Sequence, residues 1–231
     1  MTVSRRSFIA AGCGATAMGL VPWGASGLMA SPRPDGKVVT PLEAIRRLER
    51  GNSRHVHGKP ARKTYAPPGQ SPEAGQWPFA AIVTCSDSRV VPEDAFDVAA
   101  KNLFVIRNAG NVTDDVTLGS LEYAVEHTGV SLIVVMGHTF CGAVTAANET
   151  LKTGVEPEPH VDSIVELILP AILDLPATHT LNQAVTANAQ FQASQVQNFS
   201  PIIAEKTHEG TVGIVQAIYN IGTGRVTFLP V

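Results

Sequence analysis

The chain has 231 residues, of which 44% are hydrophobic and 16% are charged, and its formal net charge is −3 at pH 7. This apolar content excludes a wholly disordered chain, and the length suits one good-sized globular core rather than two. The weak negative charge, without a basic stripe or a polybasic cluster, predicts no nucleic-acid partner and no attachment to an anionic membrane surface.

The first thirty residues differ in composition from the rest of the chain. Ser4–Ile9 reads Ser-Arg-Arg-Ser-Phe-Ile, a twin-arginine pattern, and an apolar stretch rich in Ala and Gly follows to about Ala30 without any acid or base. Such a segment is typical of a bacterial export signal. Helix-weakening residues argue against a membrane-spanning helix here. They are Gly12, Gly14, Gly19, Pro22, Gly24 and Gly27. We predict that residues 1–30 are a twin-arginine-type signal peptide, and that the mature protein has no stable membrane span and is periplasmic or secreted.

Residues 31–76 are predicted to form a linker and an N-terminal helical arm. Thr40 is suited to cap a helix, Pro41 to occupy its first position, and Glu43 to complete the cap from three residues later. Gly51 weakens the helical pattern. The remainder of this region is rich in Pro, Gly and charged residues and has no hydrophobic pattern of its own.

Near Trp77 the predicted core domain begins, and we place it at residues 77–231. Apolar runs predict strands at Phe79–Thr84, Leu103–Ile106, Val130–Met136 and Thr211–Tyr219. Helices are predicted at Asp114–His127, from Cys141 to Leu151, at Val161–Leu175 with an interruption at Pro170, and at Thr180–Phe199, which is polar on one face. A turn after Tyr219 predicts a hairpin that returns at Arg225–Leu229.

This alternation of strands and helices favours an α/β fold. We expect a mainly parallel central sheet flanked by helices, with an antiparallel C-terminal edge strand and the N-terminal helical arm.

Soft metal ligands follow two of the predicted strands. Cys85 comes directly after the first, and His138 and Cys141 come directly after the third. Sites in parallel sheets form outside the carboxyl ends of the strands, so the two groups could meet there. Two thiols and one imidazole are a zinc donor set that leaves a fourth tetrahedral position open. Cys141 also begins a helix, whose N-terminal field is expected to lower its thiol pKa.

Asp87 and Arg89 lie two and four residues beyond Cys85. A fork-shaped pair with Arg89 would keep Asp87 ionised and aimed. Zinc lowers the pKa of bound water toward ~7. An ionised Asp87 could accept a hydrogen bond from the resulting hydroxide, or could itself approach the metal. The pattern therefore predicts a nucleophile that is available to a small electrophile at neutral pH.

The two cysteines allow other interpretations. In an oxidising compartment Cys85 and Cys141 could form a disulfide, and either could simply be a buried small hydrophobe. The combination of a His-x-x-Cys motif, a distant Cys and an Asp–Arg pair, all at strand ends, favours the metal site.

Three segments closely resemble the β-class carbonic anhydrases, and the resemblance runs from about Phe79 to Leu229. They are Cys85-Ser86-Asp87-Ser88-Arg89-Val90, Arg107-Asn108-Ala109-Gly110-Asn111 and Gly137-His138-Thr139-Phe140-Cys141-Gly142-Ala143-Val144. In this motif Gly110 is expected to need a positive φ, and the N–H of Gly142 could face a bound anion.

The resemblance implies a carbonic anhydrase, a zinc lyase that converts carbon dioxide reversibly to bicarbonate and a proton. It implies Zn²⁺ held by Cys85, His138 and Cys141, with zinc-bound hydroxide oriented by an Asp87–Arg89 dyad. Asp87 is the fourth zinc ligand in the closed state of some members. The resemblance also implies a homodimer or a multiple of dimers, with the N-terminal arm crossing to the partner.

Two features of the resemblance leave alternatives open. Members with a non-catalytic bicarbonate site carry a Trp three residues before the first zinc Cys and a Gly directly before it, where this chain has Ile82 and Thr84. This departure argues against bicarbonate inhibition of that kind. The same zinc site would also suit hydrolysis of carbonyl sulfide or carbon disulfide. A non-catalytic bicarbonate- or zinc-binding protein is a further alternative, against which the intact Asp87 and Arg89 weigh.

Overall fold

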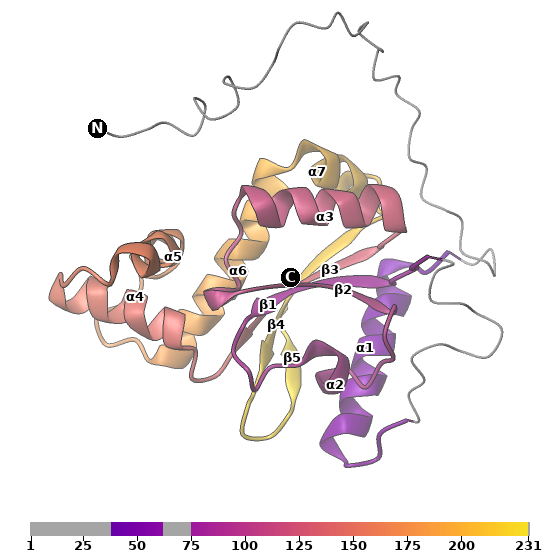
Figure 1. The fold of residues 1–231 in the computed structure, drawn as a ribbon, viewed down its shortest axis with the longest axis horizontal. Helices are drawn as coiled ribbons and strands as arrows, with labels where there is room; N and C mark the ends of the chain where they lie inside the picture. The colour runs from indigo at the N-terminus through magenta and orange to yellow at the C-terminus, as the bar shows by residue number, and fades with distance from the viewer. Residues whose placement is uncertain (1–37, 62–74, 231) are drawn as a thin grey trace, which may run out of the picture.

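The computed structural model describes residues 38–61 and 75–230, so the predicted signal peptide and part of the linker lie outside the described residues. A five-stranded sheet forms the centre of the molecule, in the order β2-β1-β3-β4-β5 (Figure 1). The strands are β1 (Ala80–Cys85), β2 (Leu103–Asn108), β3 (Leu132–His138), β4 (Gly213–Tyr219) and β5 (Val226–Phe228). The first four are parallel and β5 is antiparallel to β4, which confirms the predicted fold class.

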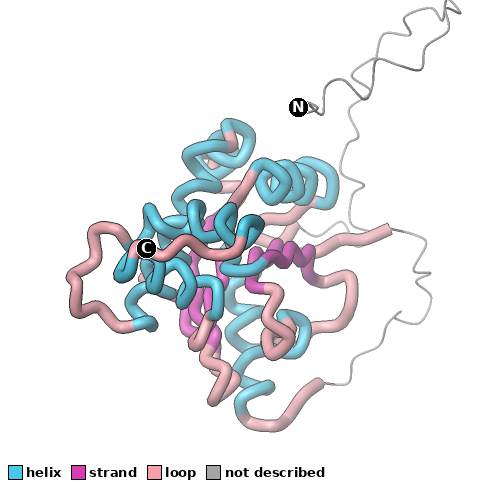
Figure 2. Tube along the Cα trace, turned by 60° about the vertical axis from the view of Figure 1, so that its left-hand side comes forward, coloured by secondary structure: helices cyan, strands magenta, loops and turns pink. Residues whose placement is uncertain are grey.

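Helices cover both faces of this sheet, and the strands lie in the interior between them (Figure 2). The helices are α1 (Pro41–Val56), α2 (Pro92–Ala95), the 3₁₀ turn η3 (Ala109–Asn111), α3 (Asp115–Thr128), α4 (Gly142–Thr153), α5 (Pro159–Ile172), α6 (Leu181–Phe199) and α7 (Pro201–His208). Helices α1 and α2 lie on one face, and α3, α6 and α7 contribute side chains to the core on the other. Strands β1 and β3 are buried along their whole length, as expected of central parallel strands.

Helix α1 is part of the core of this chain. Its predicted cap is present, because Thr40 Oγ1 accepts a hydrogen bond from the Glu43 N–H at 3.2 Å. Ala44 and Leu48 are fully buried in the cluster that contains the strand side chains of one sheet face. The core therefore begins earlier in the chain than the expected start near Trp77.

Helix α1 continues through Gly51, which allows it to approach α2. A Cβ at Gly51 would lie 1.7 Å from the Phe96 carbonyl oxygen, so a residue with a side chain cannot occupy this position without a shift of the backbone. Next to it, Asn52 Nδ2 donates to the carbonyl oxygens of Ala95 and Gly224, both at 2.8 Å, and its Oδ1 accepts from the Val226 N–H at 2.9 Å. One buried amide thus joins α1, α2 and the β4–β5 hairpin.

Pro170 does not interrupt α5, contrary to the sequence-based expectation. The helix continues to Ile172, because the proline falls in its last turn and the buried Val165, Ile168 and Ile172 hold this face against the core. Helices α2 and α7 were not predicted. Within residues 38–61 and 75–230, we find no helix that combines the length and the apolar character needed to cross a membrane.

Candidate metal centre

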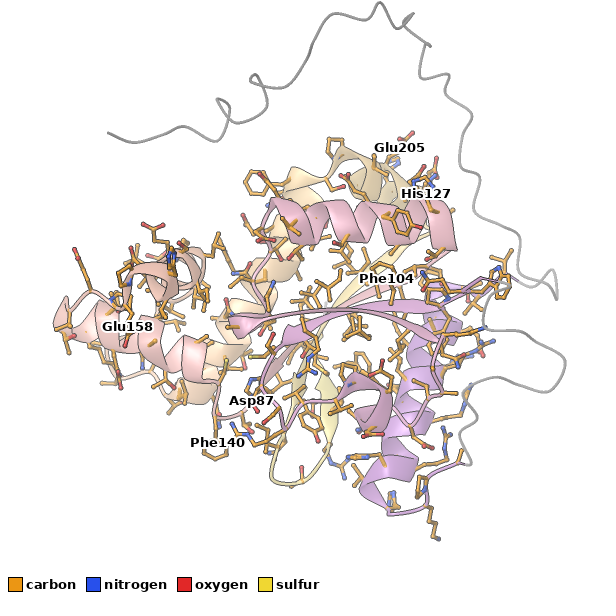
Figure 3. All side chains as sticks on the ribbon, in the orientation of Figure 1. Asp87, Phe104, His127, Phe140, Glu158 and Glu205 are labelled. Carbon is orange, nitrogen blue, oxygen red and sulfur yellow. The ribbon has the colours of Figure 1, made fainter. Side chains whose placement is uncertain are left out.

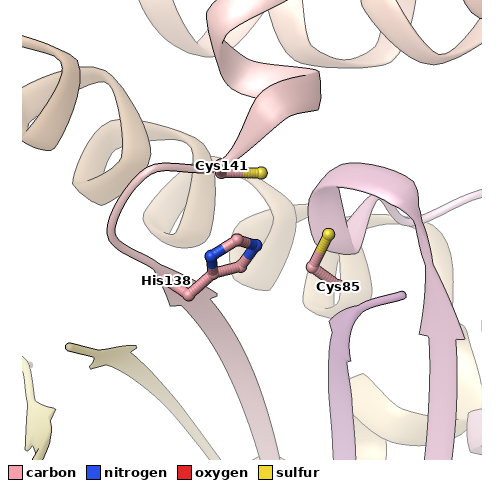
Figure 4. A group of neighbouring side chains, drawn as sticks. All are labelled: Cys85, His138 and Cys141. Atoms are coloured by element: carbon pink, nitrogen blue, oxygen red, sulfur yellow. The ribbon is translucent and has the colours of Figure 1, made fainter. Parts of the chain in front are cut away.

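The predicted ligands meet at one edge of the sheet. Cys85 is the last residue of β1 and His138 the last of β3, and these strands are parallel neighbours. Cys141 caps the start of α4, three residues after His138. One ligand atom from each residue lies within 4.8 Å of the others, and all three residues are buried. Figure 4 shows the two sulfur atoms and the imidazole ring converging.

The hydrogen bonding of His138 fits a metal ligand. Its Nδ1 lies 2.9 Å from the Thr139 carbonyl oxygen, which can only accept, so Nδ1 carries the proton and Nε2 presents a lone pair. Nε2 is buried and has no hydrogen-bond partner. A tetrahedral zinc ion with bonds of about 2.3 Å to sulfur and about 2.0 Å to nitrogen separates its ligand atoms by roughly 3.6–3.8 Å. The three ligand atoms lie within 4.8 Å of one another, so a contraction of about 1 Å at most brings them to this spacing, and the three side chains are positioned to bind a metal ion.

The two thiols share one hydrogen bond, so the ionisation of one affects the other. Both cysteines are free, so no disulfide joins them. A hydrogen bond from the Cys141 thiol lowers the pKa of Cys85 to about 4. The same bond, together with burial, raises the pKa of Cys141. The N–H groups of Val144 and Ala143 act in the expected direction on Cys141, but its bond to Cys85 outweighs them. Because two adjacent thiolates repel each other, this pair gains from a divalent cation.

Asp87 and Arg89 form a fork-shaped ion pair beside the cluster. Arg89 Nε donates to Asp87 Oδ1 at 2.9 Å, and Nη2 donates to Oδ2 at 2.6 Å. These bonds hold the pKa of Asp87 well below its usual range. Arg107 fixes the same loop from its backbone side, because its Nη2 donates to the Asp87 carbonyl oxygen at 2.8 Å. Within the described ranges, Asp87 does not belong to the group of three convergent ligands.

Gly110 contacts the cluster directly. Its φ is 76°, as expected, and its N–H donates to Cys85 Sγ at 3.3 Å. Gly142, at the start of α4, differs because, apart from its chain neighbours and its own helix backbone, no described residue lies within 4 Å of where its Cβ would be. Ile82 and Thr84 are both fully buried, and Thr84 Oγ1 donates to the Met136 carbonyl oxygen at 2.9 Å. These two residues therefore serve the sheet core.

Phe140 is a feature of the site that the sequence analysis did not single out. It links His138 and Cys141 with a φ of 60°, which is unusual for an aromatic residue. Its side chain is 67% exposed, and in the view of Figure 3 it lies at the same end of the molecule as Asp87. Thr139 anchors this link, because its N–H donates to the Tyr219 carbonyl oxygen at 3.0 Å and its Oγ1 accepts from the Ile221 N–H at 3.1 Å.

Fold and site together define an α/β metalloprotein whose soft ligands lie at the strand ends. A family model described as carbonic anhydrase matches residues 80–226. Carbonic anhydrase 2 of Mycobacterium tuberculosis is 36% identical over 193 residues, which cover 80% of this chain and 91% of that protein. The carbonic anhydrase of Mycolicibacterium smegmatis is 39% identical over 195 residues, which cover 80% and 92%.

Solved structures give the same result. The β-carbonic anhydrase CcaA is 29% identical, with a TM-score of 0.62 over 68% of this chain and 82% of that chain. One of two tetrameric β-carbonic anhydrases from Sordaria macrospora is 25% identical, with a TM-score of 0.60 over 69% and 84%. The chain therefore belongs to the β-class carbonic anhydrase family. This confirms the predicted family, its enzyme class and zinc as the cofactor that the three ligands are positioned to bind.

Proposed function

We propose that this protein catalyses the reversible hydration of carbon dioxide to bicarbonate and a proton, with zinc held by Cys85, His138 and Cys141. The observation that carries the proposal is the convergence of these three ligands beside an Asp87–Arg89 ion pair in a chain of this family. When bound, zinc supplies a Lewis acid that brings the pKa of water to about 7.

Asp87 orients the nucleophile. Its lowered pKa keeps the carboxylate ionised at neutral pH, so it can only accept hydrogen bonds. A hydroxyl group beside it must therefore donate a hydrogen bond to Asp87, which turns the oxygen lone pairs away from the carboxylate and toward the substrate.

Arg89 holds Asp87 in this role. Both carboxylate oxygens accept hydrogen bonds from the guanidinium, and Oδ1 also accepts from the Arg89 backbone N–H at 3.0 Å. Turning Asp87 onto the metal would break the paired side-chain bonds. This geometry supports a fourth metal position that is open to water while the ion pair is formed.

The test is carbon dioxide hydration by zinc-loaded variants, followed by stopped flow with a pH indicator. Asp87→Asn keeps the shape of the side chain but replaces one carboxylate oxygen with an amide N–H₂, which donates hydrogen bonds where the proposed role needs an acceptor. We expect kcat/KM to fall about 10²-fold or more, as for a misplaced reacting group. Arg89→Met should reduce it as well, with Arg50→Met as a matched control at a similarly exposed arginine (side chains 51% and 59% exposed). Full activity of zinc-loaded Asp87→Asn would refute the assigned role.

Export to the periplasm or the medium is part of the proposal and is supported by the composition of residues 1–30. Cell fractionation tests it. The full chain should leave the cytoplasm, and a variant that carries both Arg5→Lys and Arg6→Lys should stay there. Equal distribution of the two chains would contradict a twin-arginine signal.

The protein assembles as a dimer or a multiple of dimers. Support comes from large apolar side chains that are exposed on the single chain, among them Val116, Phe140 and Phe199. Light scattering of the purified protein should give at least twice the chain mass, and a monomer at micromolar concentration would contradict this part.

A further inference from the structure

Helix α6 carries two buried amide side chains, one helical turn apart. Asn188 is 0% exposed and Gln192 is 1% exposed. Gln192 Nε2 donates to Asn188 Oδ1 at 3.1 Å, so the two amides form one unit. Buried polar groups of this kind are unfavourable unless they are hydrogen-bonded, so their partners indicate what the unit holds.

Two of their three partners lie on the segment that contacts the metal centre. Asn188 Nδ2 donates to the Gly110 carbonyl oxygen at 2.9 Å. Gln192 Oε1 accepts from the Thr113 N–H at 2.8 Å, and Thr113 Oγ1 donates to the Gln192 carbonyl oxygen at 3.2 Å. The remaining Gln192 N–H donates to the Leu167 carbonyl oxygen of α5 at 2.8 Å. The amide pair thus holds both ends of the segment from Gly110 to Thr113.

Gly110 depends on such support. Glycine has no Cβ to restrict its backbone, so its surroundings must fix its conformation. A Cβ here would lie 2.7 Å from Ile168 Cδ1 and 3.1 Å from Ala143 Cβ, which leaves the position to glycine. Asn188 holds the carbonyl of this residue while its N–H donates to Cys85 Sγ.

We propose that Asn188, supported by Gln192, is a positioning residue for the metal ligand Cys85. It acts through Gly110, whose N–H it keeps directed at the sulfur. A hydrogen bond to a ligand sulfur fixes its direction and withdraws charge from it. Loss of a group that hydrogen-bonds to a metal ligand typically lowers metal affinity 10–100-fold. The inference rests on the proposed zinc site, but not on the reaction.

The test compares zinc-loaded wild type with Asn188→Leu and with the smaller Asn188→Ser. Val196→Ala on the same helix is the control, because Val196 is fully buried in the cluster that faces α3 and α7 and lies away from Gly110. Zinc release to an excess of a coloured chelator is one readout. The second readout is the sulfur-to-cobalt charge-transfer absorption of cobalt-substituted protein. A purely structural role of Asn188 would leave this absorption unchanged.

We expect zinc release to be about 10–100-fold faster in both Asn188 variants, with a shifted charge-transfer band, and to be unchanged in Val196→Ala. Wild-type release and absorption in any folded Asn188 variant would overturn the inference. The same acceleration in Val196→Ala would also overturn it, because global destabilisation would then explain the effect. Should Asn188→Leu fail to fold, Asn188→Ser decides. Inactive wild-type protein with one zinc per chain would refute the proposed function alone.

Discussion

Two glycines near the metal ligands are expected to respond oppositely to the same substitution. Gly110 has a φ of 76°, and a Cβ there would meet Ile168 Cδ1 at 2.7 Å and Ala143 Cβ at 3.1 Å. Gly142 has no positive φ and has open space at its Cβ position. We predict that Gly110→Ala strongly destabilises the fold, whereas Gly142→Ala does not.

The magnitude follows from two terms at Gly110. A left-handed conformation costs an L-residue about 1–2 kcal/mol, and overpacking typically costs about 1–3 kcal/mol. Alanine also restricts the unfolded chain more than glycine does, which stabilises the folded state by roughly 0.4–1 kcal/mol. The expected net loss in the free energy of unfolding is therefore about 1–5 kcal/mol. At Gly142 only the helix propensity changes, so we expect between 0 and about 1 kcal/mol of stabilisation.

Urea unfolding followed by far-UV circular dichroism measures both values. Free zinc must be buffered at one concentration for all three proteins, because a bound metal adds to apparent stability by mass action. A loss below ~1 kcal/mol in Gly110→Ala would refute the reasoning, since backbone strain and overpacking together should cost at least that much after the offset from the unfolded chain. A comparable loss in Gly142→Ala would refute it as well.

Two further predictions concern the ligand set and the place of α1. Cys141→Ser removes one of three soft ligands, so we expect the protein to lose stoichiometric zinc on dialysis; one zinc per chain by metal analysis would contradict the ligand assignment. Asn52→Ala leaves one buried and two partly buried backbone groups without their partner and should reduce the free energy of unfolding by about 2 kcal/mol or more. A change below ~1 kcal/mol in a urea titration would show that α1 does not depend on these contacts.

The metal ligands could be predicted because their signals are local. Cys85 and His138 each end an apolar run that is long enough to form a buried strand, and Cys141 follows within the same motif. The spacing of Asp87 and Arg89 similarly allows a fork-shaped pair without any knowledge of the fold. Helix α7 also had a local signal that was overlooked, because Ser200 caps it and Pro201 begins it.

Other features depend on contacts between distant parts of the chain. In α1, Leu42 is 56% exposed, while Ala44 and Leu48 are fully buried. Which face of a helix is buried depends on the elements that pack against it, and those elements lie far away in the sequence. The hydrogen bond between the Cys141 and Cys85 thiols has the same origin, since Cys85 lies 56 residues earlier in the sequence.

The polar residues of α6 show this limit most clearly. From the sequence, the helix has one polar face, and such a face is normally assigned to solvent. Asn188 and Gln192 are instead buried beneath the metal centre, where their partners lie 78 and 79 residues away in the sequence. A buried amide is favourable only when its partners are in place. These two residues therefore become evidence for a functional role once the order of the strands is known, because that order brings Gly110 and Cys85 to α6.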